Sequence, residues 1–188
     1  QRNDGIGHGT AIAVLAVFAV TVLGIFLGTG DPSNTMEMFN LVPVPDLKDS
    51  SRMQLSLQFG DLQLPQDQYR DPASKKIRDV YVDYITRMHQ QQGDAPDVAA
   101  AKARTILAME AELAAKRLTP LQLYEPALIY NLLSVDEAQA LIPALDLRAM
   151  ASAAGLTLPA QVQVYDIGAV KATQQLLSSR PAQDVQTL

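Results

Sequence analysis

The feature that most constrains the fold of this chain is an uncharged apolar run near its N-terminus. Residues 10–28, TAIAVLAVFAVTVLGIFLG, are 19 positions without a charged side chain, and Asp4 and Asp31 are the nearest charges on either side. At about 1.5 Å per residue, a helix of this length crosses the ~30 Å hydrocarbon core of a bilayer. The run therefore predicts a single transmembrane helix over residues 10–29, after an N-terminal cap of residues 1–9.

A cleavable signal peptide is the competing interpretation of this run, because an N-terminal apolar stretch is often a removed h-region. The run is longer than the usual h-region, and Arg2 is the only basic residue before it. An uncleaved anchor is therefore favoured. The first lysine after the span is Lys48, so the positive-inside rule places the N-terminus in the cytoplasm and the C-terminal domain outside it, in the periplasm of a bacterium.

Small residues recur four apart at the start and end of the predicted span. Gly9 and Ala13, and then Gly24 and Gly28, lie on helix faces that a second helix could approach closely, so they are the candidate partner-binding residues. The alternative is that small residues are simply common in such helices. His8 could contact the pigment or haem of a partner, or it could be a solvated polar end of the helix.

Charge and cysteine content exclude several classes of function. Lys and Arg total 15 against 20 Asp and Glu, which gives a net charge of −5, and the basic residues form no cluster. A nucleic-acid partner is therefore excluded, since phosphate binding needs a positive patch. The absence of cysteine excludes disulfides, thiolate metal sites and cysteine nucleophiles.

Residues 30–72 are expected to form an extended connector because prolines interrupt them throughout. The prolines are Pro32, Pro43, Pro45, Pro65 and Pro72. Proline fixes φ and lacks a backbone donor, so no long helix fits here. Within the connector, residues 52–59, RMQLSLQF, alternate apolar and polar side chains and predict a short strand.

Residues 73–188 predict a small α-helical domain that begins with a helix pair. Asp71 is a good N-cap, Pro72 suits the first helical position, and Gly93 ends the helix. The apolar residues at helical spacing are Ile77, Tyr81, Tyr84, Ile85 and Met88. A second, alanine-rich helix from about Pro96 to Arg117 should pack antiparallel to the first. The tyrosines at positions 81, 84, 124 and 130 are expected to be core residues rather than a ligand cage.

The rest of the chain predicts three further helices, the opening of a fourth, and one strand. Ser134 and Glu137 form a capping box, and Asp146 and Gly155 bound a helix over residues 147–154. The segment AQVQVYD alternates apolar and polar residues and predicts a strand. Residues 167–179 predict another helix, and residues 181–188 resemble the first turns of a further helix. The predicted fold class is therefore mainly α, with a single transmembrane helix, an extended proline-containing connector and a small α-helical extramembrane domain with minor strand content.

Four segments, in order, resemble a known family. They are DLKDSSRMQLSLQFGDLQLPQDQYRDP, IRDVYVDYITRMHQQQGD, ARTILAMEAELAAKRLTP and IYNLLSVDEAQALIPALDLRAMASAAGL. Together they resemble part of the neprilysin-like zinc metallopeptidases, in which a Gly-Leu-x-Leu-Pro turn followed by an aromatic leads into a helix pair. Gly60, Leu62, Leu64, Pro65 and Tyr69 match this turn. The resemblance covers residues 46–188 and implies the non-catalytic, helical side of such an enzyme.

The catalytic motifs of that family are absent. Its zinc is held by the two histidines of an H-E-x-x-H helix and a distant glutamate. This chain has only His8 and His89, which are 81 residues apart and lack the pattern, and the family's Asn-Ala-(aromatic) segment is also missing. No catalytic residue, zinc ligand or cofactor site can therefore be carried over.

Pairs of neighbouring acids do not change this conclusion. Asp67 with Asp71, and Glu110 with Glu112, could form acid/base pairs, but a chain with 20 acids places such pairs on its surface by chance. We therefore expect no enzymatic activity and no cofactor.

Three hypotheses of function remain open. The leading one is a non-enzymatic, single-span accessory subunit, a pseudoenzyme that docks on and stabilises a larger respiratory or photosynthetic membrane complex, with its other subunits and membrane lipid as partners. The alternative is the N-terminal fragment of a membrane-anchored neprilysin-like zinc metallopeptidase. A third is a stand-alone peptide- or inhibitor-binding module.

Overall fold

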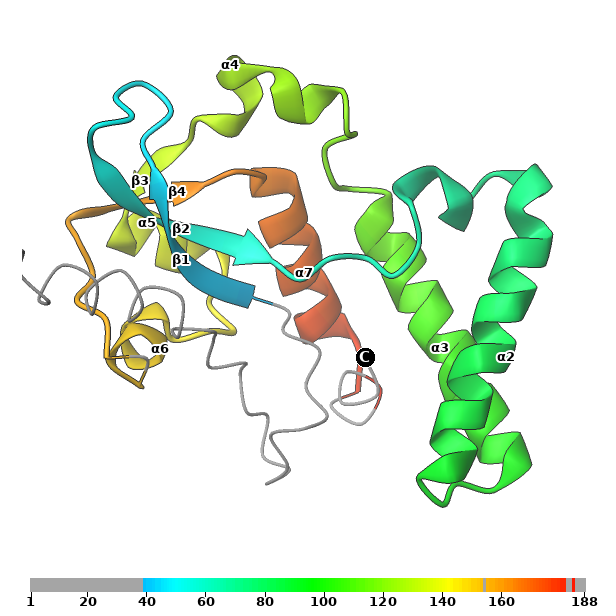
Figure 1. The fold of residues 1–188 in the computed structure, drawn as a ribbon. Coiled ribbons are helices and arrows are strands. Elements are labelled where there is room, and N and C mark those ends of the chain that lie inside the picture. The colour runs from blue at the N-terminus through cyan, green and yellow to red at the C-terminus, as the bar shows by residue number, and fades with distance from the viewer. Residues whose placement is uncertain (1–38, 154, 182–183, 185–188) are drawn as a thin grey trace, which may run out of the picture.

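The computed structural model describes residues 39–153, 155–181 and 184, which form a small sheet with helices against it and a separate long helix hairpin (Figure 1). The strands are β1 (Phe39–Pro45), β2 (Met53–Phe59), β3 (Leu132–Ser134) and β4 (Gln161–Val164). The α-helices are α2 (Lys75–Gln91), α3 (Pro96–Ala114), α4 (Pro126–Ile129), α5 (Val135–Leu141), α6 (Leu147–Ala153) and α7 (Ile167–Ser179). The 3-10 helices are η1 (Gln66–Tyr69), η2 (Pro72–Ser74) and η3 (Gln122–Tyr124).

The sheet is mixed and joins segments that are distant in sequence. Its strand order is β1-β2-β4-β3. β1 and β2 are an antiparallel pair, β2 runs parallel to β4 with Leu57 opposite Val164, and β3 runs antiparallel to β4 with Leu133 opposite Val162. β1 and β2 come before the helix hairpin of α2 and α3 in the sequence, and β3 and β4 come after it. The sheet is therefore complete only when both parts of the chain are in place.

The prediction of an extended connector is wrong over residues 39–72, while residues 30–38 of the predicted connector lie outside the described part. The strand expected at residues 52–59 is confirmed as β2, but it pairs with β1, which the sequence did not predict. β1 contains Pro43 and Pro45 and lies at the edge of the sheet, where a missing backbone donor is tolerated because only one side of the strand is paired. This segment is therefore half of a sheet and not a linker.

The main hydrophobic core lies between the sheet and helices α5, α6 and α7. Leu57, Val162 and Val164 of the strands pack with Ile142, Leu147 and Val170 of the helical side. The core also includes Phe39, whose ring meets that of Phe59 edge to face with centroids 5.1 Å apart. The core therefore depends on both ends of the described chain.

Local signals placed most helices correctly. Asp71 Oδ1 accepts a hydrogen bond from Ala73 N at 3.0 Å, so Asp71 caps the helical segment that continues into α2. The capping box of Ser134 and Glu137 is present at the start of α5, and Asp146 caps α6. The strand predicted before residue 166 and the helix predicted over residues 167–179 are confirmed as β4 and α7.

The hairpin of α2 and α3 is confirmed, but only part of the predicted apolar face of α2 lies inside it. Ile85 packs with Ala103 and Ile106 of α3, and the small alanines let the two helices approach closely. Tyr84 is exposed, as is Tyr124, so the prediction that these two tyrosines belong to the core is wrong. The apolar pattern of α2 is wider than the surface that α3 covers.

The predicted fold class is wrong as a whole. The described residues form a four-stranded mixed sheet with helices, not a small α-helical domain behind an extended connector. Among the described helices, none has the length and hydropathy needed to cross a bilayer. The transmembrane helix predicted for residues 10–29 and the cap at residues 1–9 lie outside the described residues.

Two substitutions on the same strand test whether the sheet carries the core. Leu57 is completely buried whereas Met53 is 62% exposed. Leu57→Ala should lower the free energy of unfolding by about 2–5 kcal/mol because it leaves a cavity. Met53→Ala should change it by less than about 0.5 kcal/mol. Urea unfolding of both variants measures the difference, and equal effects would contradict the assignment of β2 to the core.

Candidate functional site

The segment between β2 and η2, residues 60–71, is fixed to the last turns of α3 and the residues after it by buried and partly buried hydrogen bonds. Tyr69 Oη donates to Glu110 Oε2 at 3.1 Å and accepts from Leu64 N at 3.0 Å. Gln66 Nε2 donates to the carbonyl oxygens of Ala114 and Arg117 at 2.7 and 2.8 Å, which α3 leaves free at its C-terminal end. The segment is thus a folded joint between the sheet and the hairpin.

Glu110 is the centre of this joint and is only 1% exposed. Tyr81 Oη of α2 donates to its Oε1 at 3.0 Å, so the carboxylate joins α2, α3 and the segment that carries Tyr69. Burial raises the pKa of Glu110 above its ordinary value of 4.5, and the hydrogen bonds from Tyr81 and Tyr69 oppose this shift only in part. Burial also raises the pKa values of Tyr69 and Tyr81, so both phenols remain protonated donors.

A second buried acid joins α3 to α7. Asp166 caps α7 by accepting from Ala169 N at 2.8 Å, and its other oxygen accepts from Leu118 N at 2.6 Å. Gly168 lies so close to the turn after α3 that an added Cβ would be 2.7 Å from the carbonyl oxygen of Lys116. The turn after α3 and the start of α7 are therefore held in direct contact, and Met109 and Leu113 of α3 pack with Leu176 farther along α7.

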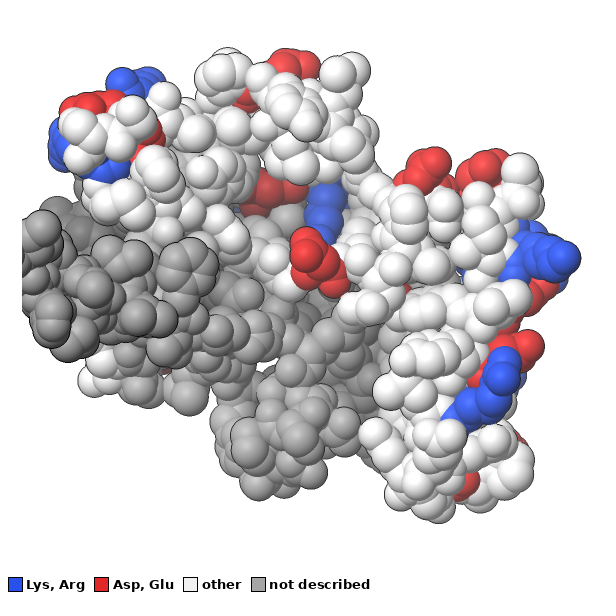
Figure 2. Space-filling view, viewed as in Figure 1, with Lys and Arg blue, Asp and Glu red and all other residues white. Residues whose placement is uncertain are grey.

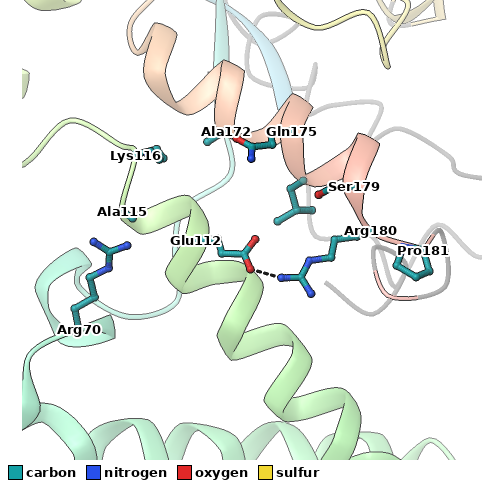
Figure 3. Close-up of a pocket in the computed structure, with 10 residues that line it drawn as sticks. Arg70, Glu112, Ala115, Lys116, Ala172, Gln175, Ser179, Arg180 and Pro181 are labelled. Carbon is teal, nitrogen blue, oxygen red and sulfur yellow. Dashed lines mark hydrogen bonds and ion pairs between the residues drawn. The ribbon is translucent and has the colours of Figure 1, made fainter.

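Beside the contact between α3 and α7 lies a groove of about 600 Å³, which is the candidate functional site (Figure 3). Residues of α3, α7 and the joint line it: Arg70, Glu112, Ala115, Lys116, Ala172, Gln175, Leu176, Ser179, Arg180 and Pro181. Figure 3 shows Glu112 of α3 paired with Arg180, which follows α7, and Arg70 on the opposite side. Three separate segments of the chain thus contribute side chains to the groove.

The charges of the groove favour an anion. Arg180 Nη2 donates to Glu112 Oε1, which neutralises both groups. Arg70 and Lys116 have no side-chain hydrogen bond or ion pair with any described residue. The groove therefore has a net positive charge and can hold a carboxylate or another small anion. On the face shown in Figure 2, by contrast, positive and negative side chains are interspersed.

The groove has no means of hydrolysing a peptide bond by itself. No histidine lines it, its single carboxylate is paired with Arg180, and its one hydroxyl belongs to Ser179. Nucleophilic or general-base catalysis needs a base within hydrogen-bond reach of the reacting group. The described lining residues therefore offer charge and shape but no base beside the one hydroxyl.

The described residues do not fit a zinc ion either. Among them no three His, Cys, Asp or Glu side chains lie close enough to hold a metal. His89 Nδ1 lies 3.2 Å from Asp94 Oδ2, and the ammonium of Lys102 lies 2.7 Å from the same oxygen. A cation thus already occupies the position beside the carboxylate, and this histidine belongs to the turn between α2 and α3.

The residues singled out in the sequence do not meet at this site. Gly9, Ala13, Gly24 and Gly28 lie outside the described residues, as does His8. The acid pairs separate: Asp71 is a cap and Asp67 is exposed, while Glu110 is buried and Glu112 faces the groove. No sequence pattern predicted the groove, because Glu112 and Arg180 are 68 residues apart.

Comparison with protein families places the chain in a class of peptidase. The family model for the N-terminal part of Peptidase family M13 matches residues 23–188. The chain therefore belongs to Peptidase family M13, and the predicted resemblance to the neprilysin-like zinc metallopeptidases is confirmed. No match was found among curated proteins.

Solved structures of the zinc metalloprotease Zmp1 of Mycobacterium tuberculosis share the fold. The crystal structure in complex with an inhibitor aligns with 93% of this chain at a TM-score of 0.71 and 22% identity. The cryo-EM structure in the open state aligns with 80% of it at a TM-score of 0.70 and 22% identity. The alignments cover 25% and 24% of the Zmp1 chains, so this chain spans about a quarter of their length.

These findings correct the leading hypothesis of function. They favour the alternative, a part of a metallopeptidase, and none of them supports an accessory subunit of a respiratory or photosynthetic complex. The description as a structural accessory subunit is contradicted, because the family is that of a peptidase. The predicted topology depended on residues 1–38, which lie outside the described part.

The raised pKa of Glu110 gives a pH test of the joint. The folded chain holds this proton more tightly than the unfolded chain, so stability should fall as pH rises from 4.5 through the raised pKa. Glu110→Gln removes the titration and should flatten that part of the stability profile. Urea unfolding of the 188-residue chain across this pH range measures the slope.

Glu112→Gln is the matched control, because Glu112 lies on the same helix but is exposed. This variant should keep the slope of the unsubstituted chain. A Glu110→Gln profile that coincides with that of the unsubstituted chain would show that burial of Glu110 does not control stability.

Proposed function

We propose that the chain is the non-catalytic N-terminal part of a zinc metallopeptidase, and that the zinc ligands and the general base lie in another part of the same polypeptide. The observation that carries the proposal is the match of residues 23–188 to the N-terminal part of Peptidase family M13, in a chain without an H-E-x-x-H motif. When bound elsewhere in such an enzyme, zinc activates a water molecule for attack on the peptide carbonyl.

In this function the described residues supply shape and binding surface. The joint at Glu110 fixes the hairpin relative to the sheet, and the Asp166 cap fixes α7 against α3. The groove between α3 and α7 adds two unpaired cations, Arg70 and Lys116, to that surface. None of these groups is placed to activate a water molecule or to hold a metal, so the part contributes through the position of its elements.

The test compares this chain with the polypeptide encoded by its complete reading frame. The complete polypeptide should contain stoichiometric zinc and hydrolyse peptides, and a chelator should abolish the hydrolysis. The 188 residues alone should show neither property. Zinc content by metal analysis and cleavage of a quenched fluorescent peptide measure both.

His89→Ala serves as the control for adventitious metal binding, because His89 is the single histidine of the described residues. This variant of the complete polypeptide should retain its zinc. Chelator-sensitive hydrolysis by the 188 residues alone, or a complete polypeptide without zinc, would refute the proposed function.

A further inference from the structure

One face of α2 exposes a row of large apolar side chains to solvent. Ile77, Val80, Tyr84 and Met88 are between 41% and 58% exposed. They are spaced three, four and four residues apart, which puts them on a single stripe along the helix. We refer to these four residues as the α2 apolar face.

No other described element covers the α2 apolar face. α2 packs chiefly on α3, through Ile85, and on η1 and η2 at its N-terminal end. In Figure 1 the hairpin lies at the far side of the molecule from the sheet, with no other described element beyond it. A contiguous apolar stripe on the surface of a protein commonly marks an interaction site.

The helical spacing of the four side chains in the α2 apolar face suits a partner that is itself a helix. Rows of side chains three and four apart form ridges and grooves that accept the ridges of another helix. The exposed charges of α2 lie beside the stripe and carry both signs, with Lys76 and Arg87 near Asp83. A mixed border of this kind suits the polar flank of an amphipathic helix and not an anionic lipid surface.

The small size of the stripe favours a partner in the same polypeptide. Four half-exposed side chains offer much less than the ~800 Å² per partner that a stable complex of separate proteins buries. A segment joined by the chain itself has an effective concentration in the millimolar range, so a small interface is sufficient. The aligned Zmp1 structures are about four times as long as the part that this chain matches, so such relatives contain a large further length of polypeptide.

We propose that the α2 apolar face is the docking surface for an amphipathic helix from the remainder of the peptidase polypeptide. The inference rests on the proposed function, since it requires a longer polypeptide. It assigns to the hairpin a specific task, which is to hold the rest of the enzyme against this part by packing of a third helix beside α2 and α3.

The absence of cysteine from the 188 residues allows a direct test by thiol labelling. Tyr84→Cys and Val80→Cys each place a single thiol on the face, and Gln90→Cys places one on another exposed side of α2. In the 188-residue chain all three thiols should react with a maleimide at similar rates. In the complete polypeptide the thiols at positions 80 and 84 should react at least tenfold more slowly, while the thiol at position 90 is unchanged, with the labelled peptides identified by mass spectrometry.

Each outcome of this test either supports or overturns the proposal. Equal labelling at positions 84 and 90 in the complete polypeptide would overturn it, as would a reading frame that adds no further chain. If the thiols at positions 80 and 84 are protected in the 188-residue chain alone, and the protection grows with protein concentration, the face binds a second copy of the chain. If they are protected only when phosphatidylcholine vesicles are added, the face binds lipid. Either result would overturn the proposal. Protection without zinc-dependent hydrolysis would refute the proposed function and leave the docking surface standing.

Discussion

Two tyrosine hydroxyls donate hydrogen bonds to the buried carboxylate of Glu110, and the arrangement of the whole structure depends on this contact. Tyr69 belongs to the joint that follows the sheet, Tyr81 belongs to α2, and Glu110 belongs to α3. A buried acid that lost either donor would lie in an apolar environment with an unmet hydrogen bond, which costs free energy. The joint and the hairpin therefore have one favourable arrangement, and the sheet at the start of the joint is placed by it.

This arrangement also orients the two surfaces discussed above, the groove beside α3 and α7 and the α2 apolar face. The groove lies beside α3 and α7, which the Asp166 contact and the packing of Leu113 with Leu176 hold together, and Arg70 reaches the groove from the joint. The α2 apolar face points away from α3 because Tyr81 and Ile85 occupy the inner side of α2. Under the proposed function, both surfaces would support an active site formed in another part of the polypeptide, since these residues belong to Peptidase family M13 and lack its zinc-binding motif.

The sequence predicted those features that depend on neighbouring residues. The caps at Asp71, Ser134 and Asp146 and the helix hairpin follow from local patterns, and the structure confirms them. The sheet was missed because β2 and β4 pair across about a hundred residues, and because prolines in β1 resemble those of a linker. The groove and the exposed side of α2 could not be predicted either, since an apolar residue at helical spacing has the same pattern whether its partner is α3 or a further segment.

The most direct test of this account is a double-mutant cycle between Tyr81→Phe and Glu110→Leu at neutral pH. If the hydroxyl of Tyr81 stabilises the fold through the carboxylate of Glu110, the two changes must be coupled, because Tyr81→Phe removes the donor and Glu110→Leu removes the acceptor of the same hydrogen bond. Urea unfolding of the four chains should give a coupling free energy of about 0.5–3 kcal/mol. Effects that add to within about 0.3 kcal/mol would contradict the claim that this buried carboxylate holds the hairpin in place.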